Sequence, residues 1–533
     1  MTDEDTLPAD DSNPSQSQPA KKRGLLASTA VVSVMTLLSR VLGLIRDMVF
    51  AHLLGVSAGT DAFFVAFRIP NFLRRLFAEG AFNQAFVPVL SEYKTRGPLA
   101  ATRELIDKVA GTLGWILFWV AIFGVVAAPW LITLFAPGFG EDAHKRELAI
   151  EMLRITFPYI FFISLTALAG SILNTWNRFA VPAFTPVLLN VSLIGAALFL
   201  APLFAEERMA VGLAWGVMIA GVVQLLFQLP FLWRLGLLPK PKFFWQDEGV
   251  QKILKLMLPA LFGVSVSQIN LLLDTVLASL LATGSVTWLY YSDRLTELPL
   301  GVFGIAIATV ILPSLSKKHA AQSTESFSHT IDWALKLVLL IGWPAALAIA
   351  TISQPLLSSL FQYGEFSARD VVMASQSLMA YSAGLLAFMF IKILAPGFYA
   401  RQDTSTPVKI GVITLVVNMV LMLAFIYPLK HAGLALATSL AAWVNAGLLW
   451  HRLRKDGAYL PQSGWWLYLA RLALAGTVMA ALLWWLAGDP ARWHSWSAAS
   501  RVGHLSLLIL AGFGSYFAVL LLTGLRPAHL RHH

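Results

Sequence analysis

Four arginines stand inside long apolar segments of the chain, where their charge demands an explanation. Arg40, Arg46 and Arg74 lie in the first two such segments, and Arg294 lies in a later one. A charged side chain at the centre of a bilayer costs about 2.5–3.5 kcal/mol even on lenient insertion scales. We therefore expect these arginines to face a wet interior lined by protein. Because the arginine fork donates two parallel hydrogen bonds to phosphate, they predict an anionic cargo such as a pyrophosphate.

Internal ion pairing is the alternative interpretation of the same arginines. Arg46 adjoins Asp47 in the sequence. Arg294 adjoins Asp293 and stands three residues before Glu297, which is the spacing of neighbours on a helix. These three acids are candidates for gating or coupling, because they could neutralise the arginines in one state and release them in another.

Four further charged residues also have candidate roles. Asp61 follows a short polar turn, where it could gate, relay protons or simply cap the next helix. Glu79 could pair with a base to close an inner gate. Asp274 lies inside a later apolar segment, as a candidate cation or proton site or an ion-pair partner. Arg74 could bind cargo, or could snorkel at a rim of the cavity.

The composition is that of an all-α polytopic membrane protein. Hydrophobic residues make up 57% of the 533 residues and charged residues only 13%, against about 25% in a soluble domain. Apolar stretches of about 20 residues recur along the chain, and each can satisfy its own backbone hydrogen bonds as a helix. We count about fourteen, near residues 25–54, 61–92, 106–135, 148–174, 181–205, 209–235, 252–283, 286–315, 328–352, 372–400, 406–428, 432–452, 464–487 and 502–525.

The charge distribution predicts the topology. The net charge is +10, and Lys and Arg concentrate in alternate turns. This positive-inside pattern places both termini in the cytoplasm and accounts for the basic excess without nucleic acid. Residues 1–24 are polar and rich in Pro and Ser, which predicts a disordered cytoplasmic tail, and 526–533 form a second tail.

Several kinds of chemistry are excluded. The chain contains no cysteine, which rules out disulfides, thiol catalysis and Cys-based metal sites. It has no G-x-x-x-x-G-K-[ST] motif and no H-E-x-x-H motif. We therefore expect a transporter rather than an enzyme, without a cofactor, driven by membrane potential, H⁺ or Na⁺.

Two segments of the chain resemble each other, at 44–94 and 271–318. Asp47 matches Asp274 at an offset of 227 residues, and Arg68 matches Arg294 at 226. Chance similarity between apolar helices is the alternative. Six spans separate the copies, so both would insert the same way up, with cargo between the halves. The predicted units are a lobe at 25–237 (helices 1–6), a second lobe at 250–455 (helices 7–12), and two appended helices at 464–525.

Several stretches of the sequence closely resemble the MurJ/MviN family of lipid II flippases, within the multidrug/oligosaccharidyl-lipid/polysaccharide exporter superfamily. They include SRVLGLIRD (39–47), GTDAFFVAFRIPNFLRRLFAEGAFNQAFVPVLSEY (59–93), YYSDRL (290–295), FQYGEF (361–366) and APGFYARQDTSTPVK (395–409). The resemblance covers nearly the whole chain from residue 25 and includes the polar stretches as well as the apolar ones.

The resemblance implies a flippase that moves lipid II, an undecaprenyl-pyrophosphate-linked disaccharide-pentapeptide, across the bacterial inner membrane by alternating access. It implies that Arg40, Arg46, Asp61, Arg74 and Arg294 match functionally critical charges of the family. It also implies a groove for the lipid tail along helices 13 and 14, and a sodium site to which Asp274, and with it Asp403, would correspond. Expected partners are lipid II, membrane lipids and cell-wall synthesis proteins.

Other functions remain open on physical grounds. A related exporter would carry another polyprenyl-pyrophosphate oligosaccharide. A multidrug antiporter of the same superfamily should have an acidic cavity instead. A polytopic glycosyltransferase or ligase would need a sizeable extramembrane loop or metal-binding carboxylates. A structural scaffold for cell-wall enzymes would not need charges inside the membrane.

Overall fold

The structure is a computed structural model that describes residues 18–301, 305–321 and 323–525; within these ranges, the side chains of 18–30, 77–80, 260, 262–264, 266–267 and 305–310 are not described. All regular elements in these ranges are helical, as expected for an all-α membrane protein. Nine helical segments of this described part are long and apolar enough to cross a membrane. One of them, α16, is kinked at Lys430 (φ 51°), so it supplies two spans. Each half also begins with two more highly charged helices, α1 and α2 in the first and α10 and α11 in the second, which is consistent with fourteen spans.

The helices of the first half are α1 (Gln18–Leu54), α2 (Ala58–Leu73), α3 (Asn83–Arg96), α4 (Leu99–Val126), α5 (Ala128–Phe135), α6 (Ala143–Thr156), α7 (Tyr159–Thr175), α8 (Ala180–Gly195) and α9 (Met209–Arg234). Two π-helical segments, η1 (Arg74–Phe82) and η3 (Ala196–Leu200), and three short 3₁₀ turns, η2 (Pro137–Glu141), η4 (Ala201–Leu203) and η5 (Glu206–Arg208), complete it.

The second half contains α10 (Glu248–Ser279), α11 (Ser285–Pro299), α12 (Ile305–Ala320), α13 (Thr324–Thr351), α14 (Ser353–Leu360), α15 (Ala368–Tyr399) and α16 (Ser405–Lys455). The appended helices are α17 (Trp465–Ala487), the short α18 (Pro490–Ser495) and α19 (Ala498–Leu522).

The two halves repeat the same order of helices at a constant offset. In the first half α4, α5, α6 and α8 begin at residues 99, 128, 143 and 180. In the second half α13, α14, α15 and α16 begin at residues 324, 353, 368 and 405, each 225 residues later. The π-helical geometry that begins at Arg74 also recurs at Leu300, 226 residues on. The fold is therefore two six-helix lobes related by a parallel repeat, with two further helices.

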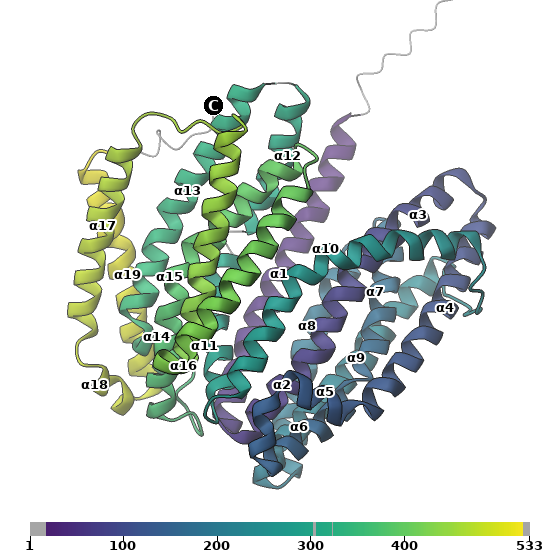
Figure 1. Cartoon of the computed structure of the whole chain (residues 1–533), viewed down its shortest axis with the longest axis horizontal. Coiled ribbons are helices and arrows are strands. Elements are labelled where there is room, and N and C mark those ends of the chain that lie inside the picture. Colours follow the sequence, from purple (N-terminus) through teal and green to yellow (C-terminus); the bar gives the residue numbers. More distant parts are fainter. Residues whose placement is uncertain (1–17, 302–304, 322, 526–533) are drawn as a thin grey trace, which may run out of the picture.

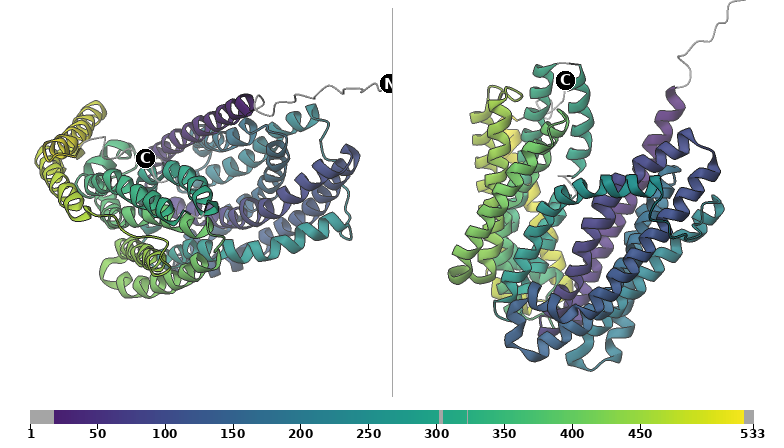
Figure 2. Two further views of the ribbon diagram at one scale, coloured as in Figure 1. Left: turned by 90° about the horizontal axis from the view of Figure 1, so that it is seen from above. Right: turned by 45° about the vertical axis from the view of Figure 1, so that its right-hand side comes forward.

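The lobes touch at one end and separate at the other. In Figure 1 they meet low in the picture, near α2 and α11, and diverge towards α3 on one side and α12 on the other. The turned view in Figure 2 shows the same divergence. We call these the closed end and the open end. Helices α17 and α19 lie against the second lobe only, on its far side from the first lobe.

The hydrophobic cores of the two lobes join at the closed end. Ala51 of α1 is buried in the core of the second lobe, beside Trp288 and Tyr291. Met422 of α16 is likewise buried in the core of the first lobe. This exchange of apolar side chains holds the lobes together at the closed end. Polar residues lie between the lobes further towards the open end.

Candidate functional site

A large polar cavity lies between the lobes, with about 1540 Å³ of space. Its lining comes mainly from α1, α8 and α11, the helices that face each other across the lobe interface. Five lining side chains are cationic and two are anionic, which leaves a formal charge of +3. The cations are Arg40, Arg46, Arg75, Arg294 and Lys392, and the anions are Asp47 and Glu297. The formal charge of this lining is therefore complementary to that of an anion.

A buried ion cluster joins the two lobes at one wall of this cavity. The Arg46 guanidinium donates to Asp47 Oδ1 at 2.6 Å, and the other oxygen of Asp47 lies 3.1 Å from Arg294 Nε. Tyr290 of α11 donates its hydroxyl to Asp47 Oδ1 and accepts from Arg46 Nη2, each at 2.8 Å. One carboxylate thus contacts an arginine from each lobe.

Asn190 of α8 fixes the position of Arg46. Its side-chain oxygen accepts from Arg46 Nη1 at 3.0 Å, and its Nδ2 donates to the Ser39 carbonyl at 2.9 Å. Gly43 lies between these two residues on α1, and a Cβ there would stand 3.8 Å from the Asn190 amide. That distance is an ordinary van der Waals contact, and α1 runs without a break through this region.

Arg40 reaches across to the second lobe. A Cβ on Gly301 would stand only 1.9 Å from Arg40 Nη1, so a larger residue at 301 would displace the guanidinium from this position. Arg294 also pairs with Glu297 at 3.2 Å, one helical turn along α11. Arg40 from the first lobe and Arg294 from the second therefore both contribute positive charge to this cavity.

The remaining predicted residues lie apart from this wall. Arg74 donates Nε to Asn71 at 3.0 Å, and Arg75 rather than Arg74 lines the cavity in the described residues. Asp293 is half-buried and interacts electrostatically with Glu297, Arg68 and Arg294. The side chain of Glu79 lies outside the described residues.

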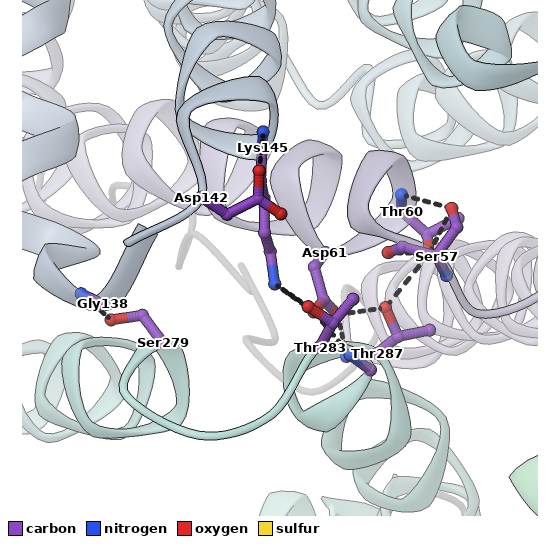
Figure 3. Close-up of polar contacts among 10 residues, drawn as sticks. Ser57, Thr60, Asp61, Gly138, Asp142, Lys145, Ser279, Thr283 and Thr287 are labelled. Atoms are coloured by element: carbon purple, nitrogen blue, oxygen red, sulfur yellow. Dashed lines mark hydrogen bonds and ion pairs between the residues drawn. The ribbon is translucent and has the colours of Figure 1, made fainter. Parts of the chain in front are cut away.

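Asp61 links the lobes at the closed end (Figure 3). It is almost fully buried, and its carboxylate accepts from the backbone N–H of Gly284 at 2.7 Å and of Thr287 at 3.0 Å. The Thr287 hydroxyl donates at 2.6 Å and Lys145 Nζ at 2.8 Å. Asp61 therefore caps α11 of the second lobe, while its own helix is capped by Ser57.

A second contact closes the same end. The Glu365 N–H donates to the His52 carbonyl at 3.1 Å, which docks the turn at 361–366 against the end of α1. Gly55 and Gly364 have positive φ angles of 56° and 58°. A Cβ on Gly364 would stand 2.2 Å from the His52 carbonyl oxygen, so this approach requires glycine.

A separate polar pocket surrounds Asp274 inside the second lobe. Its Oδ1 is buried without a hydrogen-bond partner, and the side-chain oxygen of Asn418 is in the same situation. Asn418 is placed by a 2.6 Å hydrogen bond from its Nδ2 to Asn270, one turn before Asp274. Thr438 lies beside the carboxylate. Asp403, by contrast, caps the start of α16 through Thr406 N–H, outside this pocket.

Sequence reasoning missed four residues of these sites. Lys145 was interpreted only as one of the basic residues in the turns between spans. Lys392 and Asn190 were single polar residues in apolar helices. Tyr290 was part of a motif but had no assigned role. The signal that was available is the one used for the arginines, since a lone Lys or Asn in an apolar span also needs a polar surrounding.

The chain resembles known proteins along nearly its whole length. A family model described as lipid II flippase MurJ matches residues 50–502. The probable lipid II flippase MurJ of Vibrio cholerae serotype O1 is 53% identical over 515 residues, which cover 95% of this chain and 98% of that protein. The lipid II flippase MurJ of Burkholderia cenocepacia is 42% identical over 513 residues, with 95% and 99% covered.

Solved structures share the fold. A lipid II flippase MurJ in an inward closed conformation matches with a TM-score of 0.77 and 27% identity, over 92% of this chain and 98% of the other. An inward-facing multidrug transporter of the MATE family, in the MOP superfamily, matches with a TM-score of 0.66 and 17% identity, over 80% and 98%. The second likeness concerns the fold alone.

Proposed function

We propose that this chain, which belongs to the lipid II flippase MurJ family, moves lipid II from the cytoplasmic to the periplasmic leaflet of a bacterial inner membrane by alternating access. The observation that carries the proposal is the cavity between the lobes with its formal charge of +3. A diphosphate matches this charge, and the arginine forks match its oxygens. The proposal assigns no catalytic residue, because the cargo crosses unchanged.

In the first step, the open end faces the cytoplasm and admits the head group. The turns at this end carry most of the basic residues, which supports the orientation with both termini inside. The diphosphate exchanges with Asp47 as the partner of Arg46 and Arg294, with Arg40 and Lys392 adding charge. The sugars and peptide occupy the aqueous space, and the polyprenyl tail stays in the lipid, along α17 and α19.

In the second step, the contacts at the closed end must break. Asp61 leaves α11, and the turn at 361–366 leaves α1, so that the lobes can rock about their shared core. The open end then closes near Glu79, and the head group emerges in the periplasm. Asp47 recovers its arginines when the diphosphate departs, which favours release.

Return to the starting state is assigned to membrane potential or to a cation. The buried oxygens of Asp274 and Asn418 without partners support a site for H⁺ or Na⁺ in the second lobe. A cation there would neutralise Asp274 and change its interaction with Arg68 of the first lobe. Cell-wall synthesis proteins are the partners we expect to supply or use the cargo.

The test is translocation of labelled lipid II by the purified protein in vesicles. Arg40→Ala, Arg46→Ala and Arg294→Ala are each expected to lower the rate at least ~10-fold, the loss expected when a charge-assisted hydrogen bond is removed. Arg208→Ala is the matched control, since Arg208 is exposed and pairs with Glu151 outside the cavity. If all three cavity variants flip lipid II normally, the phosphate site is wrong.

The alternative exporter functions can be distinguished by the cargo that the protein transports. A flippase for another polyprenyl-diphosphate saccharide would transport that lipid faster than lipid II in the same vesicles. A multidrug antiporter for cationic compounds is disfavoured by the charge of the cavity. Depletion of the protein in cells should make lipid II accumulate on the cytoplasmic side.

A further inference from the structure

An apolar groove lies between α13, α15, α16 and α17 on the second lobe, with about 1320 Å³ of space. Leu335, Leu339, Phe390 and Leu394 form its floor, and a polar rim lies at the turn between α16 and α17. Among the described residues, the groove shares no lining residue with the central cavity. It is therefore a second and separate space, reached from the side of the molecule.

One cation at the rim has no anionic partner. The Arg454 guanidinium lies 4.8 Å from the centre of the Trp450 ring, and no hydrogen bond or ion pair to it occurs among the described residues. Its neighbour Arg452 pairs with Asp456 at 3.2 Å, so that carboxylate already has a cationic partner. No Asp or Glu is among the described residues that line the groove. The rim therefore has the charge that complements an anion.

The rim is held in a fixed shape by Asp332 of α13, which is fully buried. Its Oδ1 accepts from Trp465 Nε1 at 2.8 Å, from the Tyr459 hydroxyl at 2.9 Å and from Gln462 N–H at 3.3 Å. Lys336 balances the charge at 2.7 Å. Three lining residues are thus anchored to one carboxylate, which makes the groove a preformed site rather than a gap beside a loose turn.

We propose that this groove is a specific binding site for a membrane phospholipid. The phosphate binds Arg454, with the Ser463 hydroxyl and the Gln462 amide beside it as further donors. An acyl chain lies along the apolar floor. Exposed Trp466 stands at the rim, where tryptophan is favoured at the boundary between head groups and hydrocarbon. The bound lipid fills the space between α17 and the second lobe and so fastens the appended helices to it.

The cation at the rim distinguishes a phospholipid from the polyprenyl tail of the cargo. A polyprenyl diphosphate carries its phosphates at one end only, and those phosphates are assigned to the central cavity. A tail in this groove would leave Arg454 without an anion. A phospholipid brings its own phosphate to the head of its own chain and satisfies both features together.

The test is native mass spectrometry of the full chain released from nanodiscs of phosphatidylglycerol and phosphatidylethanolamine. Gly447→Leu fills the groove without strain, because a Cβ at Gly447 meets nothing within 4 Å. Arg454→Ala removes the phosphate contact. Each is expected to lower the fraction of protein that retains a phospholipid at least ~10-fold. The controls are Gly503→Leu, at another open position on α19, and Lys455→Ala, at the exposed neighbour of Arg454.

Two outcomes would contradict the proposed phospholipid site. Equal phospholipid retention by both groove variants and both controls would show that lipid binds without this site. Added lipid II displacing the phospholipid from the parent chain, but not from an Arg46→Ala variant of it, would assign the groove to the tail. Translocation of lipid II, measured on the same preparations, reports separately on the proposed transport function.

Discussion

Asp47 of α1 and Arg294 of α11 form an ion pair of 3.1 Å between the two lobes. At the repeat-related positions, Asp274 of α10 and Arg68 of α2 interact electrostatically, although no direct ion pair joins them among the described residues. Arg68 instead donates to Thr275, the neighbour of Asp274, at 2.8 Å. In each case an acid of one lobe faces an arginine of the other. Asp47 and Arg294 line the cavity, whereas Asp274 lies in the separate polar pocket with Asn418.

Asp47→Asn should shift the protein away from the conformation described here. The change removes the one carboxylate shared by Arg46 and Arg294, and breaking a buried pair costs about 3–5 kcal/mol. Because the chain has no cysteine, spin labels can be placed at the open end through Arg96→Cys and Lys317→Cys. We expect a shorter distance between them by double electron–electron resonance. The exposed change Glu325→Gln is the control, and an unaltered distance for Asp47→Asn would contradict the prediction.

Asp61 and Lys145 should be energetically coupled. Asp61→Ala leaves Lys145 buried at 5% exposure without its carboxylate, at a cost of about 3–5 kcal/mol. Lys145→Met should cost less, because the carboxylate keeps the donors Gly284 and Thr287. Thermal unfolding of both single variants and the double variant measures the coupling. If the losses simply add, the ion pair does not hold the closed end.

Asn190→Asp should weaken lipid II binding while the chain still folds. The new carboxylate would neutralise Arg46 and lower the formal charge of the cavity by one. We expect at least ~10-fold weaker binding of lipid II, the loss of a charge-assisted contact. Gln224→Glu is the matched control, since Gln224 is also a buried amide of this lobe that donates to a backbone carbonyl, that of Thr185 at 3.0 Å. If both changes weakened lipid II binding equally, Asn190 would have only a structural role.

The stabilisation supplied by Asp247 should disappear in acid. Burial raises the pKa of this carboxyl, but the hydrogen bond from Lys108 and those from Val250 and Gly249 N–H outweigh it, so the pKa lies below its ordinary 3.8. The stabilisation is therefore complete above pH 3.8 and is lost as the pH falls through the lower folded-state value.

The measurement for Asp247 is the difference in melting temperature between the parent chain and Asp247→Asn across pH 7 to 3. Asn keeps a capping oxygen for the helix but removes the charge paired with Lys108 at 2.7 Å, which should cost about 0.2–1 kcal/mol at pH 7. The difference should narrow only in the most acidic samples. A difference that is constant down to pH 3, or that grows there, would contradict the assigned sign.

The fold was predictable because it depends on patterns local to the sequence. Apolar runs define the spans, and the matches of Asp47 with Asp274 and of Arg68 with Arg294 indicated the repeat. Hydropathy also located the break inside α16, since the predicted spans 406–428 and 432–452 lie on either side of the kink at Lys430. It did not show that the span predicted at 106–135 is divided into α4 and α5.

The site was predictable only where a residue was anomalous by itself. Arg46 and Arg294 were conspicuous because an apolar span disfavours charge. Asp61 was conspicuous too, but its acceptor role depends on Gly284 and Thr287, more than 220 residues away in the chain. Asn190 gave little signal, since an isolated amide is tolerated in many helices. Its role follows from lying opposite Gly43, a relationship that only the tertiary structure shows.

The constant offset of 225 residues between the halves has a consequence for the origin of the protein. A chain of half this length, carrying one acid and one arginine at the repeated positions, would form both reciprocal pairs at once as a two-fold symmetric dimer. Fusing two such copies allows each pair to diverge without disturbing the other. An ancestral homodimer, duplicated and joined, would account for the reciprocal positions of the two acids and the two arginines.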